Sequence, residues 1–407
     1  MATPSFPTLD DLEPGTRVLA RLDLNSPVHG GEVEDNRRFI RHAETVRELA
    51  AADHRVVLLA HQGRPGDADF VSLEQHATIL SEHVDRDVAF CAETVGDTAS
   101  TAAEELDRGE ILLLENVRME SDELEDRTPE EHAESTFVTE LATYGDAYVG
   151  DAYSAAHRSH ATIVGLPLAM ETAVAGRVME AEYTANSAIQ SRTFEGEVTM
   201  VLGGTKADDL FRVIEGVDET VETFLLGGVI GELCLRAAGH DLGYDVETGL
   251  FDELWDEYHT TISELVSTLG ERLVLPSDLA YADADGARIE APVAGSTKTA
   301  PYFDIGQETI ETFTAVISRS DAVFVKGALG VFEDERFADG TIEVLRAIGE
   351  SDAFSVVGGG DTSRALDIYD ELDPANFDHL SIAGGAYVRA LAGESLPGVE
   401  VLRRADQ

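Results

Sequence analysis

Hydrophobic residues are arranged in this chain as short continuous runs separated by amphipathic stretches. The runs, each given with the residues that follow it, are RVLARLDLNSP, RVVLLAHQGRP, EILLLENVRME, DAYVGDAYSAAHRSH, VTMVLGGTK, TFLLGG, RLVLPSD, AVFVKG, FSVVGGGDT and HLSIAGGA. Between them, as in residues 35–52 and 252–270, apolar side chains recur at helical spacing. Continuous apolar runs that alternate with helices indicate parallel sheets covered by helices on both faces. We therefore predict an α/β fold.

The chain length favours two such sheets. A single hydrophobic core stops growing near ~250–300 residues, and this chain has 407. Ligands of open α/β sheets bind beyond the carboxyl ends of the strands. The residues that follow each predicted strand therefore describe the ligand, and they differ between the two halves of the chain.

In the first half, charged and polar side chains follow the strands. They are Asp23, Asn25, His61, Arg64, Asn116, Arg118, Asp151, His157 and Arg158. Guanidinium groups bind carboxylate or phosphate oxygens two at a time, and each charge-assisted hydrogen bond contributes roughly 1.5–3 kcal/mol. This half therefore predicts a site for a small polyanion. The histidines of HRSH (157–160) have i, i+3 spacing, but no carboxylate or cysteine pattern supports a metal there.

In the second half, glycines follow the strands, together with Lys206, Asp278, Lys326 and Asp361. Glycine at a strand-to-helix turn lets the backbone approach a ligand and leaves amides free to face a phosphate. The chain has only three lysines, and two of them, Lys206 and Lys326, lie beside such glycines. The third, Lys298, is predicted to lie in a surface loop. Neither GxxxxGK[ST] nor a complete GxGxxG is present, so we predict a nucleotide site of a different kind.

Charge and composition exclude several classes of function. The net charge of −50 repels nucleic acid and anionic lipid. Abundant acids with almost no lysine are typical of proteins from salt-loving microbes, where the Debye length falls to ~3 Å in molar salt. The two cysteines, Cys91 and Cys234, lack metal or disulfide spacing and are predicted to be buried thiols. Without a secretory pattern or a long apolar stretch, we expect a cytoplasmic protein with no membrane partner.

A series of motifs carries a resemblance to a known family. In chain order they are RLDLNSP, DNRRF, AHQGRP, LLLENVR, DAYSAAHRSH, AVAGRVMEAE, LGGTK, DIGQET, GVFE, VVGGGDT and AGGA…LAGESLPGV. Over roughly residues 15–402 the chain resembles phosphoglycerate kinase. The resemblance implies a phosphotransferase that moves a phosphoryl group reversibly between 1,3-bisphosphoglycerate and ADP, giving 3-phosphoglycerate and ATP, with Mg²⁺ accompanying the nucleotide.

The resemblance also implies roles for individual residues. The phosphoglycerate site would comprise Asp23, Asn25, Arg38, His61, Gly63, Arg64, Arg118 and Arg158. The nucleotide site would comprise Lys206, Gly227, Gly228, Gly306, Glu333, Gly359, Gly360, Asp361 and Thr362, with Asp361 next to the Mg²⁺. Arg38 and Lys206 would act on the transferring phosphoryl group, and Glu333 would bind the ribose hydroxyls.

The resemblance predicts two Rossmann-like domains joined by a hinge helix. Residues 1–169 would bind phosphoglycerate, 170–190 would form the connecting helix, and 191–385 would bind the nucleotide. Residues 386–407 would return to the first domain. Closure of the two domains would exclude water during transfer, and we expect the protein to be a monomer.

Some positions depart from the family pattern. Leu210 stands where many members have a second lysine, Lys326 replaces the asparagine before GALGVFE, and Ile382 and Ala383 replace a threonine and a glycine. We hypothesise that Lys326 joins the nucleotide site and supplies the charge missing at Leu210. The alternative for Lys326 is an ion pair with a nearby carboxylate such as Glu333 or Asp334. The alternative for the whole protein is a weak or silent paralogue that binds a nucleotide or phosphometabolite in a regulatory role.

Overall fold

The computed structural model describes residues 6–190, 194–242, 250–294 and 301–404, and Lys298 lies outside them. Contacts divide the chain into two compact units. Unit 1 comprises Met1–Thr184 and Glu394–Gln407, and unit 2 comprises Ala185–Gly393. Each unit contains a six-stranded sheet in which all neighbouring strands are parallel.

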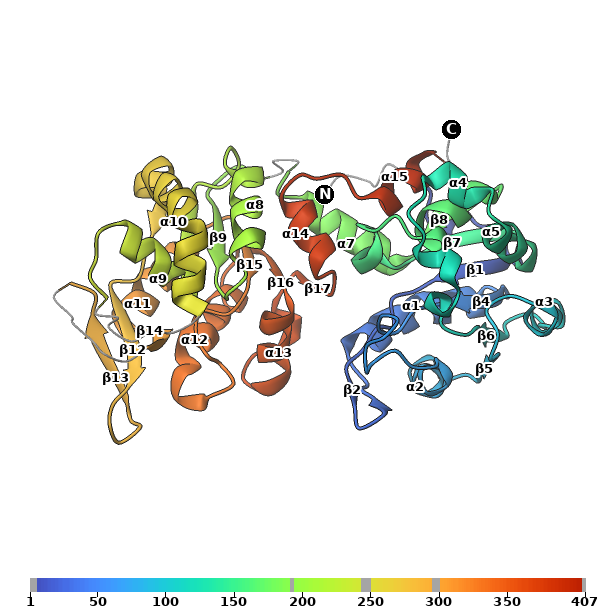
Figure 1. Cartoon of the computed structure of the whole chain (residues 1–407), viewed down its shortest axis with the longest axis horizontal. Helices are drawn as coiled ribbons and strands as arrows, with labels where there is room; N and C mark the ends of the chain where they lie inside the picture. The colour runs from blue at the N-terminus through green and yellow to red at the C-terminus, as the bar shows by residue number, and fades with distance from the viewer. Residues whose placement is uncertain (1–5, 191–193, 243–249, 295–300, 405–407) are drawn as a thin grey trace. The chain divides into compact units, whose positions relative to one another are not determined.

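In unit 1 the strands follow the order β5-β6-β4-β1-β7-β8 (Figure 1). Their bounds are β1 Arg17–Arg21, β4 Arg55–Leu59, β5 Val88–Phe90, β6 Ile111–Leu113, β7 Ala147–Gly150 and β8 Ala173–Ala175. The central strand β1 pairs with β4 and β7, so Leu19 lies opposite both Val57 and Tyr148. Because β1, β4 and β7 end at the same edge, the residues after them are brought together.

The helices of unit 1 cover this sheet. They are α1 Arg37–Ala51, α2 Glu74–Val84, α3 Asp97–Glu104, α4 Pro129–Ala133, α5 Thr136–Leu141, α6 Leu166–Ala169, α7 Arg177–Ser187, which extends into unit 2, and α15 Pro397–Arg404. The Asn36 side chain begins α1 by accepting from the Arg38 amide at 2.9 Å. Phe39, Val46 and Leu49 on the apolar face of α1 join strand residues in one core. A short hairpin joins β2 Val28–His29 to β3 Glu32–Val33.

In unit 2 the parallel strands follow the order β11-β10-β9-β15-β16-β17. Their bounds are β9 Val198–Leu202, β10 Thr223–Leu226, β11 Leu273–Val274, β15 Ala322–Lys326, β16 Phe354–Gly358 and β17 His379–Ser381. Every residue of β9 and β15 is buried, as expected for strands covered on both faces. Lys326 ends β15 opposite Leu202 of β9 and Gly358 of β16.

Unit 2 also contains a small antiparallel sheet of β12 Asp278–Ala282, β13 Arg288–Pro292 and β14 Tyr302–Ile305, in the order β13-β12-β14. Its helices are α8 Ala207–Val217, α9 Gly228–Ala237, α10 Leu250–Leu269, α11 Gln307–Ile317, α12 Asp339–Gly349, α13 Gly360–Ile368 and α14 Gly385–Leu391. The antiparallel sheet was not predicted. Asp278 begins β12 and binds the α11 amides of Glu308 and Thr309 at 3.0 and 2.8 Å, so it serves as a helix cap instead of facing a ligand.

The predicted α/β class is confirmed, and each apolar run quoted above contains a strand of one of the two parallel sheets. The amphipathic stretches 35–52 and 252–270 form α1 and α10. Cys91 and Cys234 are buried and free. Among the residues that the structure describes, none of the helices combines the length and apolar character needed to span a bilayer.

Candidate functional site

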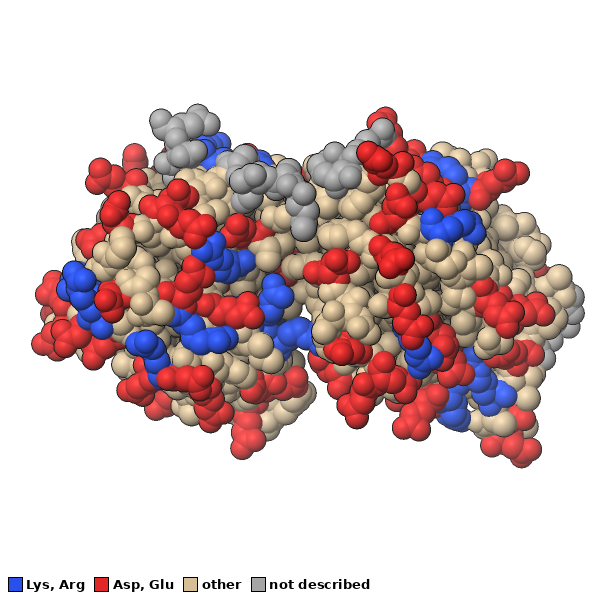
Figure 2. All heavy atoms as spheres, turned by 180° about the vertical axis from the view of Figure 1, so that it is seen from behind, with Lys and Arg blue, Asp and Glu red and all other residues tan. Residues whose placement is uncertain are grey.

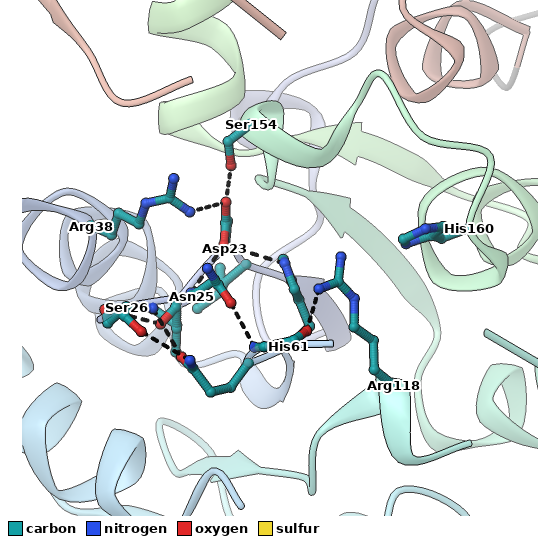
Figure 3. A network of polar contacts seen from close by, with 12 residues as sticks. Asp23, Asn25, Ser26, Arg38, His61, Arg118, Ser154 and His160 are labelled. Carbon is teal, nitrogen blue, oxygen red and sulfur yellow. Dashed lines mark hydrogen bonds and ion pairs between the residues drawn. The ribbon is translucent and has the colours of Figure 1, made fainter. Parts of the chain in front are cut away.

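Asp23 is the buried anchor of the polar site at the strand ends of unit 1 (Figure 3). Its carboxylate accepts hydrogen bonds from Arg38 on α1, from the Ser154 hydroxyl and, at 3.0 Å, from the Asn25 amide. Burial alone would raise the pKa of Asp23, but Arg38 and the Ser154 and Asn25 donors hold it well below its ordinary value. Asp23 is therefore an anion that holds Arg38 in place.

The segment after β4 is attached to the same site through Gly63. The Gly63 amide donates to Asn25 Oδ1 at 2.7 Å, and its carbonyl accepts from Arg118. Gly63 has φ +64°, and a Cβ there would lie 2.5 Å from the Asp69 carbonyl oxygen, so only glycine suits this turn. Arg64, the next residue, is exposed. The turn thus brings Arg64 and Arg118 to the strand ends that carry Asn25.

Three arginines form a cation cluster, which we define as Arg21, Arg118 and Arg158. Arg21 is fully buried, and Arg118 is 5% exposed. Burial, together with repulsion from Arg21 and Arg158, lowers the pKa of Arg118 to about 10. The Arg118 Nε atom is buried and has no hydrogen-bond partner among the described residues. Closely spaced guanidinium groups with an unused donor suit a ligand that carries several negative charges.

His61 lies between Asp23 and the cation cluster as a neutral side chain. Burial and the nearby Arg21 and Arg118 guanidinium groups hold the pKa of His61 well below its usual value, although Asp23 opposes this shift. Arg21 Nη2 lies 3.2 Å from His61 Nδ1 and can only donate. His61 therefore carries its proton on Nε2, which is 3.8 Å from Asp23 Oδ1, and it can donate a hydrogen bond without adding charge.

In unit 2, the predicted nucleotide residues lie at the strand ends and the helix starts that follow them. Gly227 and Gly306 precede α9 and α11, Gly228 begins α9, and Gly359 precedes α13. A Cβ at Gly306 would lie 2.2 Å from Asp278 Oδ2, so close packing by itself explains this glycine. The α13 turn is joined to β15 because the Gly327 amide donates to Thr362 Oγ1 at 3.2 Å.

Gly360 and Asp361 form the exposed first turn of α13, where backbone amides can face a phosphate. Glu333 is also exposed, and its Oε1 lies 3.8 Å from Arg364 Nη1. The structure thus gathers Gly359, Gly360, Asp361 and Thr362 into one turn. Glu333 lies outside that turn, next to α13.

Lys206 and Lys326 occupy different environments. Lys206 is exposed and immediately precedes α8. Lys326 is 8% exposed, and its Nζ lies 3.6 Å from Asp209 Oδ2 on α8. Burial lowers the pKa of Lys326, and Lys206 adds to this shift, while Asp209 and Asp361 oppose it. The two lysines and two aspartates therefore form a small group of mixed charge at the ends of β9 and β15.

The predicted alternative for Lys326, an ion pair with a nearby carboxylate, is found, but its partner is neither Glu333 nor Asp334. Lys326 pairs with Asp209, while Glu333 pairs with Arg364 and Asp334 with Arg336. Leu210, which follows Asp209, is fully buried in the first turn of α8. In this fold, a lysine at position 210 would bury an ammonium group at a cost in free energy. Lys326 therefore does not simply supply, from another strand end, a charge that position 210 could also carry.

Sequence reasoning missed several residues of the unit 1 site. Ser154 lies within the DAYSAAHRSH motif but was not singled out, although its hydroxyl binds Asp23. Arg21 interrupts the apolar run of β1, which was a signal that could have been used. Glu123 and Thr162, which surround Arg21, had no distinguishing sequence pattern.

Parallel α/β units with an arginine cluster at the strand ends of one and glycine turns at those of the other define the class as a two-unit α/β protein with a site suited to a small polyanion. A match to the phosphoglycerate kinase family covers residues 9–394. The phosphoglycerate kinase of Halorubrum lacusprofundi is 60% identical over 403 residues, 98% of each chain. That of Haloarcula marismortui is 56% identical over 402 residues, 98% of this chain and all of that one. The chain therefore belongs to the phosphoglycerate kinase family.

A solved structure agrees with this assignment. The crystal structure of phosphoglycerate kinase from Pyrococcus horikoshii has a TM-score of 0.90 and 31% sequence identity, covering 98% of this chain and 99% of that chain. The predicted family, fold class and enzyme class are confirmed. The alternative of a regulatory paralogue is not favoured.

The exposed arginine of the unit 1 site offers a test of its ligand. We expect Arg64→Ala to weaken 3-phosphoglycerate binding by roughly 1.5–3 kcal/mol, because one charge-assisted pair is lost. ADP affinity should stay unchanged. Isothermal titration of both ligands measures this, with Arg86→Ala as the control, since Arg86 is an exposed arginine elsewhere in unit 1. Equal losses for both ligands would contradict separate sites, and Arg118→Ala should behave like Arg64→Ala if it folds.

Lys326 offers the corresponding test in unit 2. We expect Lys326→Asn to weaken ADP and ATP binding by roughly 1–3 kcal/mol, because a cation near the glycine turn that begins α13 is removed. Asp209→Asn removes the partner of Lys326 and should leave nucleotide affinity equal or tighter. Nucleotide titrations of both variants decide the matter. If Lys326 serves only to pair with Asp209, both variants will bind ADP like the unmodified protein.

Proposed function

We propose that this chain catalyses reversible phosphoryl transfer from 1,3-bisphosphoglycerate to ADP, giving 3-phosphoglycerate and ATP. The observation that supports it most is the cation cluster, with an unused buried donor on Arg118, beside the Asp23–Arg38 pair. A triose acid with phosphate and carboxyl groups has the charge and size that such a cluster requires. The family assignment supplies the reaction.

Each site residue of unit 1 has a chemical task in this proposal. Arg64, Arg118 and Arg158 bind the phosphate and carboxylate oxygens of the triose. His61 donates its Nε2 proton, and Asn25 orients the Gly63 turn. Arg38, held by Asp23, stabilises the negative charge that spreads over the oxygens of the moving phosphoryl group.

In unit 2, we propose that the amides of the α13 turn and the Lys206 ammonium bind the nucleotide phosphates. Gly227, Gly228 and Gly306 would lie on the adenine side and Glu333 at the ribose. Lys206 would meet the transferred group. Transfer requires the acyl phosphate and ADP to meet, so we also propose a hinge-bending step within residues 170–190, which contain α7. Residues 1–169 would form the phosphoglycerate domain and 191–385 the nucleotide domain. The returning segment, predicted to comprise residues 386–407, would begin at Glu394, where the chain rejoins unit 1.

Asp361 fits a role beside nucleotide-bound Mg²⁺. It is an exposed carboxylate in the turn of residues 359–362, which we propose binds the nucleotide phosphates. Mg²⁺ is commonly held by one or two carboxylates together with phosphates and waters. The described ranges contain no group of three or more His, Cys, Asp or Glu side chains able to hold a metal without a ligand. When bound, Mg²⁺ would neutralise charge on the phosphate oxygens.

We further propose that the protein works in molar salt as a cytoplasmic monomer. Acidic side chains are spread over the face shown in Figure 2, with fewer basic ones between them, and the net charge is −50.

We expect the melting temperature to rise between millimolar and molar KCl, because salt screens self-repulsion. A gain of about 2 kcal/mol would correspond to roughly 4–8 °C for a unit of this size. Calorimetry in KCl, with sucrose as a non-ionic control, tests this, and a salt-independent midpoint would contradict it.

The proposed activity is tested by a coupled assay of ATP formation from 1,3-bisphosphoglycerate and ADP at low and molar KCl. ATP formation at either salt concentration supports the proposal. A folded protein that binds both ligands but forms no ATP under either condition would overturn it.

A further inference from the structure

The Glu123 carboxylate is fully buried against the cation cluster. Its Oε2 accepts from the Thr162 amide at 2.8 Å, and its Oε1 accepts from the Thr162 hydroxyl at 2.7 Å. Arg21 Nη2 and His160 Nδ1 lie 3.7 and 3.9 Å from Oε1. Both carboxylate oxygens therefore meet donors, which is the arrangement of an ionised group.

Glu123 links three segments of unit 1 that carry the site. Arg21 at the end of β1 donates from Nε to Thr162 Oγ1 at 2.8 Å. Thr162 lies in the π-helical turn Ala161–Gly165, directly after the segment that carries Arg158. Such turns are rare and are often found at functional sites. Glu123 itself follows Arg118 on the segment after β6, so one carboxylate connects the backbones that hold all three arginines of the cluster.

The charge at Glu123 also offsets part of the cluster's positive charge. Burial raises the pKa of Glu123, while Arg21, the two Thr162 donors and Arg118 oppose this shift by stabilising the ionised form. Asp23 pairs with Arg38, so it does not replace Glu123 beside Arg21. Figure 3 shows Arg118 between His61 and His160, and these histidines are held neutral by burial and by the same arginines. Neither histidine therefore adds charge near neutral pH.

We propose that Glu123 is a positioning residue of the substrate site, which orients the arginine cluster and moderates its charge so that the site selects the triose acid over simpler anions. The choice of the triose acid as the ligand rests on the proposed function. The contact between Glu123 and the arginine cluster is independent of that function.

The charge-neutral replacement Glu123→Gln should therefore have opposite effects on two ligands. Inorganic phosphate should bind about three- to tenfold more tightly, because the cluster loses an opposing charge. The preference for 3-phosphoglycerate over phosphate should fall by at least a similar factor, because the arginines are less well oriented. ADP affinity should not change. Titrations at one fixed KCl concentration measure all three ligands.

Glu120→Gln is the matched control, because it removes the same charge three residues earlier. Burial and the neighbouring carboxylates of Asp122 and Glu140 raise the pKa of Glu120. The Glu120→Gln variant should leave phosphate and 3-phosphoglycerate binding unchanged. If Glu123→Gln binds phosphate no more tightly than this control, the proposal is overturned. A loss of stability without a change in ligand preference would mean that Glu123 is only structural, which also overturns it.

Thr162→Val provides a second test if Glu123→Gln does not fold. It removes the hydroxyl that connects Arg21 to Glu123 but keeps the Glu123 charge. We expect weaker 3-phosphoglycerate binding with no tightening of phosphate, and unchanged binding of both ligands would refute the positioning role. If the unmodified protein forms no ATP, the proposed function fails, whereas phosphate titrations still test the role of Glu123.

Discussion

Arg38→Ala is expected to lower kcat by about 10²–10³-fold, the usual effect of removing one donor that stabilises a transition state. Arg38 is one-quarter exposed on α1 and held by Asp23, so its guanidinium is oriented before substrate arrives. Binding of ADP should change little, because the residues proposed to bind the nucleotide belong to unit 2. Coupled assays of kcat and KM for each substrate measure the effect.

Arg47→Ala is the matched control, since Arg47 is an exposed arginine of the same helix whose Nε donates to the Ala43 carbonyl at 3.3 Å. It should retain full turnover. Arg38→Ala leaves Asp23 bonded to Ser154 and the Asn25 amide, so circular dichroism should show an intact fold. If KM for 3-phosphoglycerate rises while kcat is unchanged, Arg38 binds substrate without stabilising the transition state, and its catalytic assignment is wrong.

Acid is expected to unfold unit 1 before unit 2. Burial lowers the pKa of His76 to about 4, and burial with nearby arginines lowers that of His160 to about 3. Burial also lowers the pKa values of His61 and His132. The unfolded chain takes up protons on these groups below about pH 6.5, whereas the folded unit does not. Their stabilisation is therefore present above pH 6.5 and lost as the pH falls, by about 2 kcal/mol each for His76 and His160 at pH 5.

Unit 2 contains a buried carboxyl group, Asp304, whose titration has the opposite effect on stability. Burial raises the pKa of Asp304 to about 6, so its folded form takes up a proton first and unit 2 gains stability as the pH falls from 6 toward 4. Glu123, whose pKa is also raised, offsets part of the loss in unit 1. Through His76 and His160 on one side and Asp304 on the other, the two units should therefore respond to acid in opposite directions.

The single tryptophan, Trp255 on α10, makes this measurable. Its fluorescence reports unit 2, while amide hydrogen exchange in β1 and β4 reports unit 1. At fixed molar KCl, exchange in unit 1 should accelerate between pH 7 and 5 while Trp255 fluorescence stays native. His76→Gln keeps a donor toward Gln62 but cannot titrate, so it should flatten the pH dependence. Simultaneous loss of both signals, or an unchanged slope in His76→Gln, would contradict the assignment.

The sequence by itself determined the α/β class, the strands of the parallel sheets except β5 and β8, and the residues at the carboxyl ends of those strands. This succeeded because burial on both faces forces continuous apolar runs, and parallel strands place their ends at one edge. Asp23, Asn25 and Arg118 could be recognised for that reason. The small antiparallel sheet β13-β12-β14 could not, because β13 is mostly exposed and its apolar residues alternate with polar ones.

The tertiary structure alone decided which charges meet. In a chain with 79 acids, neither spacing nor composition distinguishes Glu123 from its acidic neighbours, or Asp209 from Glu333 as the partner of Lys326. These pairings depend on which turn of a helix faces which strand end, and thus on packing between residues far apart in the chain. Local patterns describe burial within one element, whereas a buried ion pair is specified only when two elements come together.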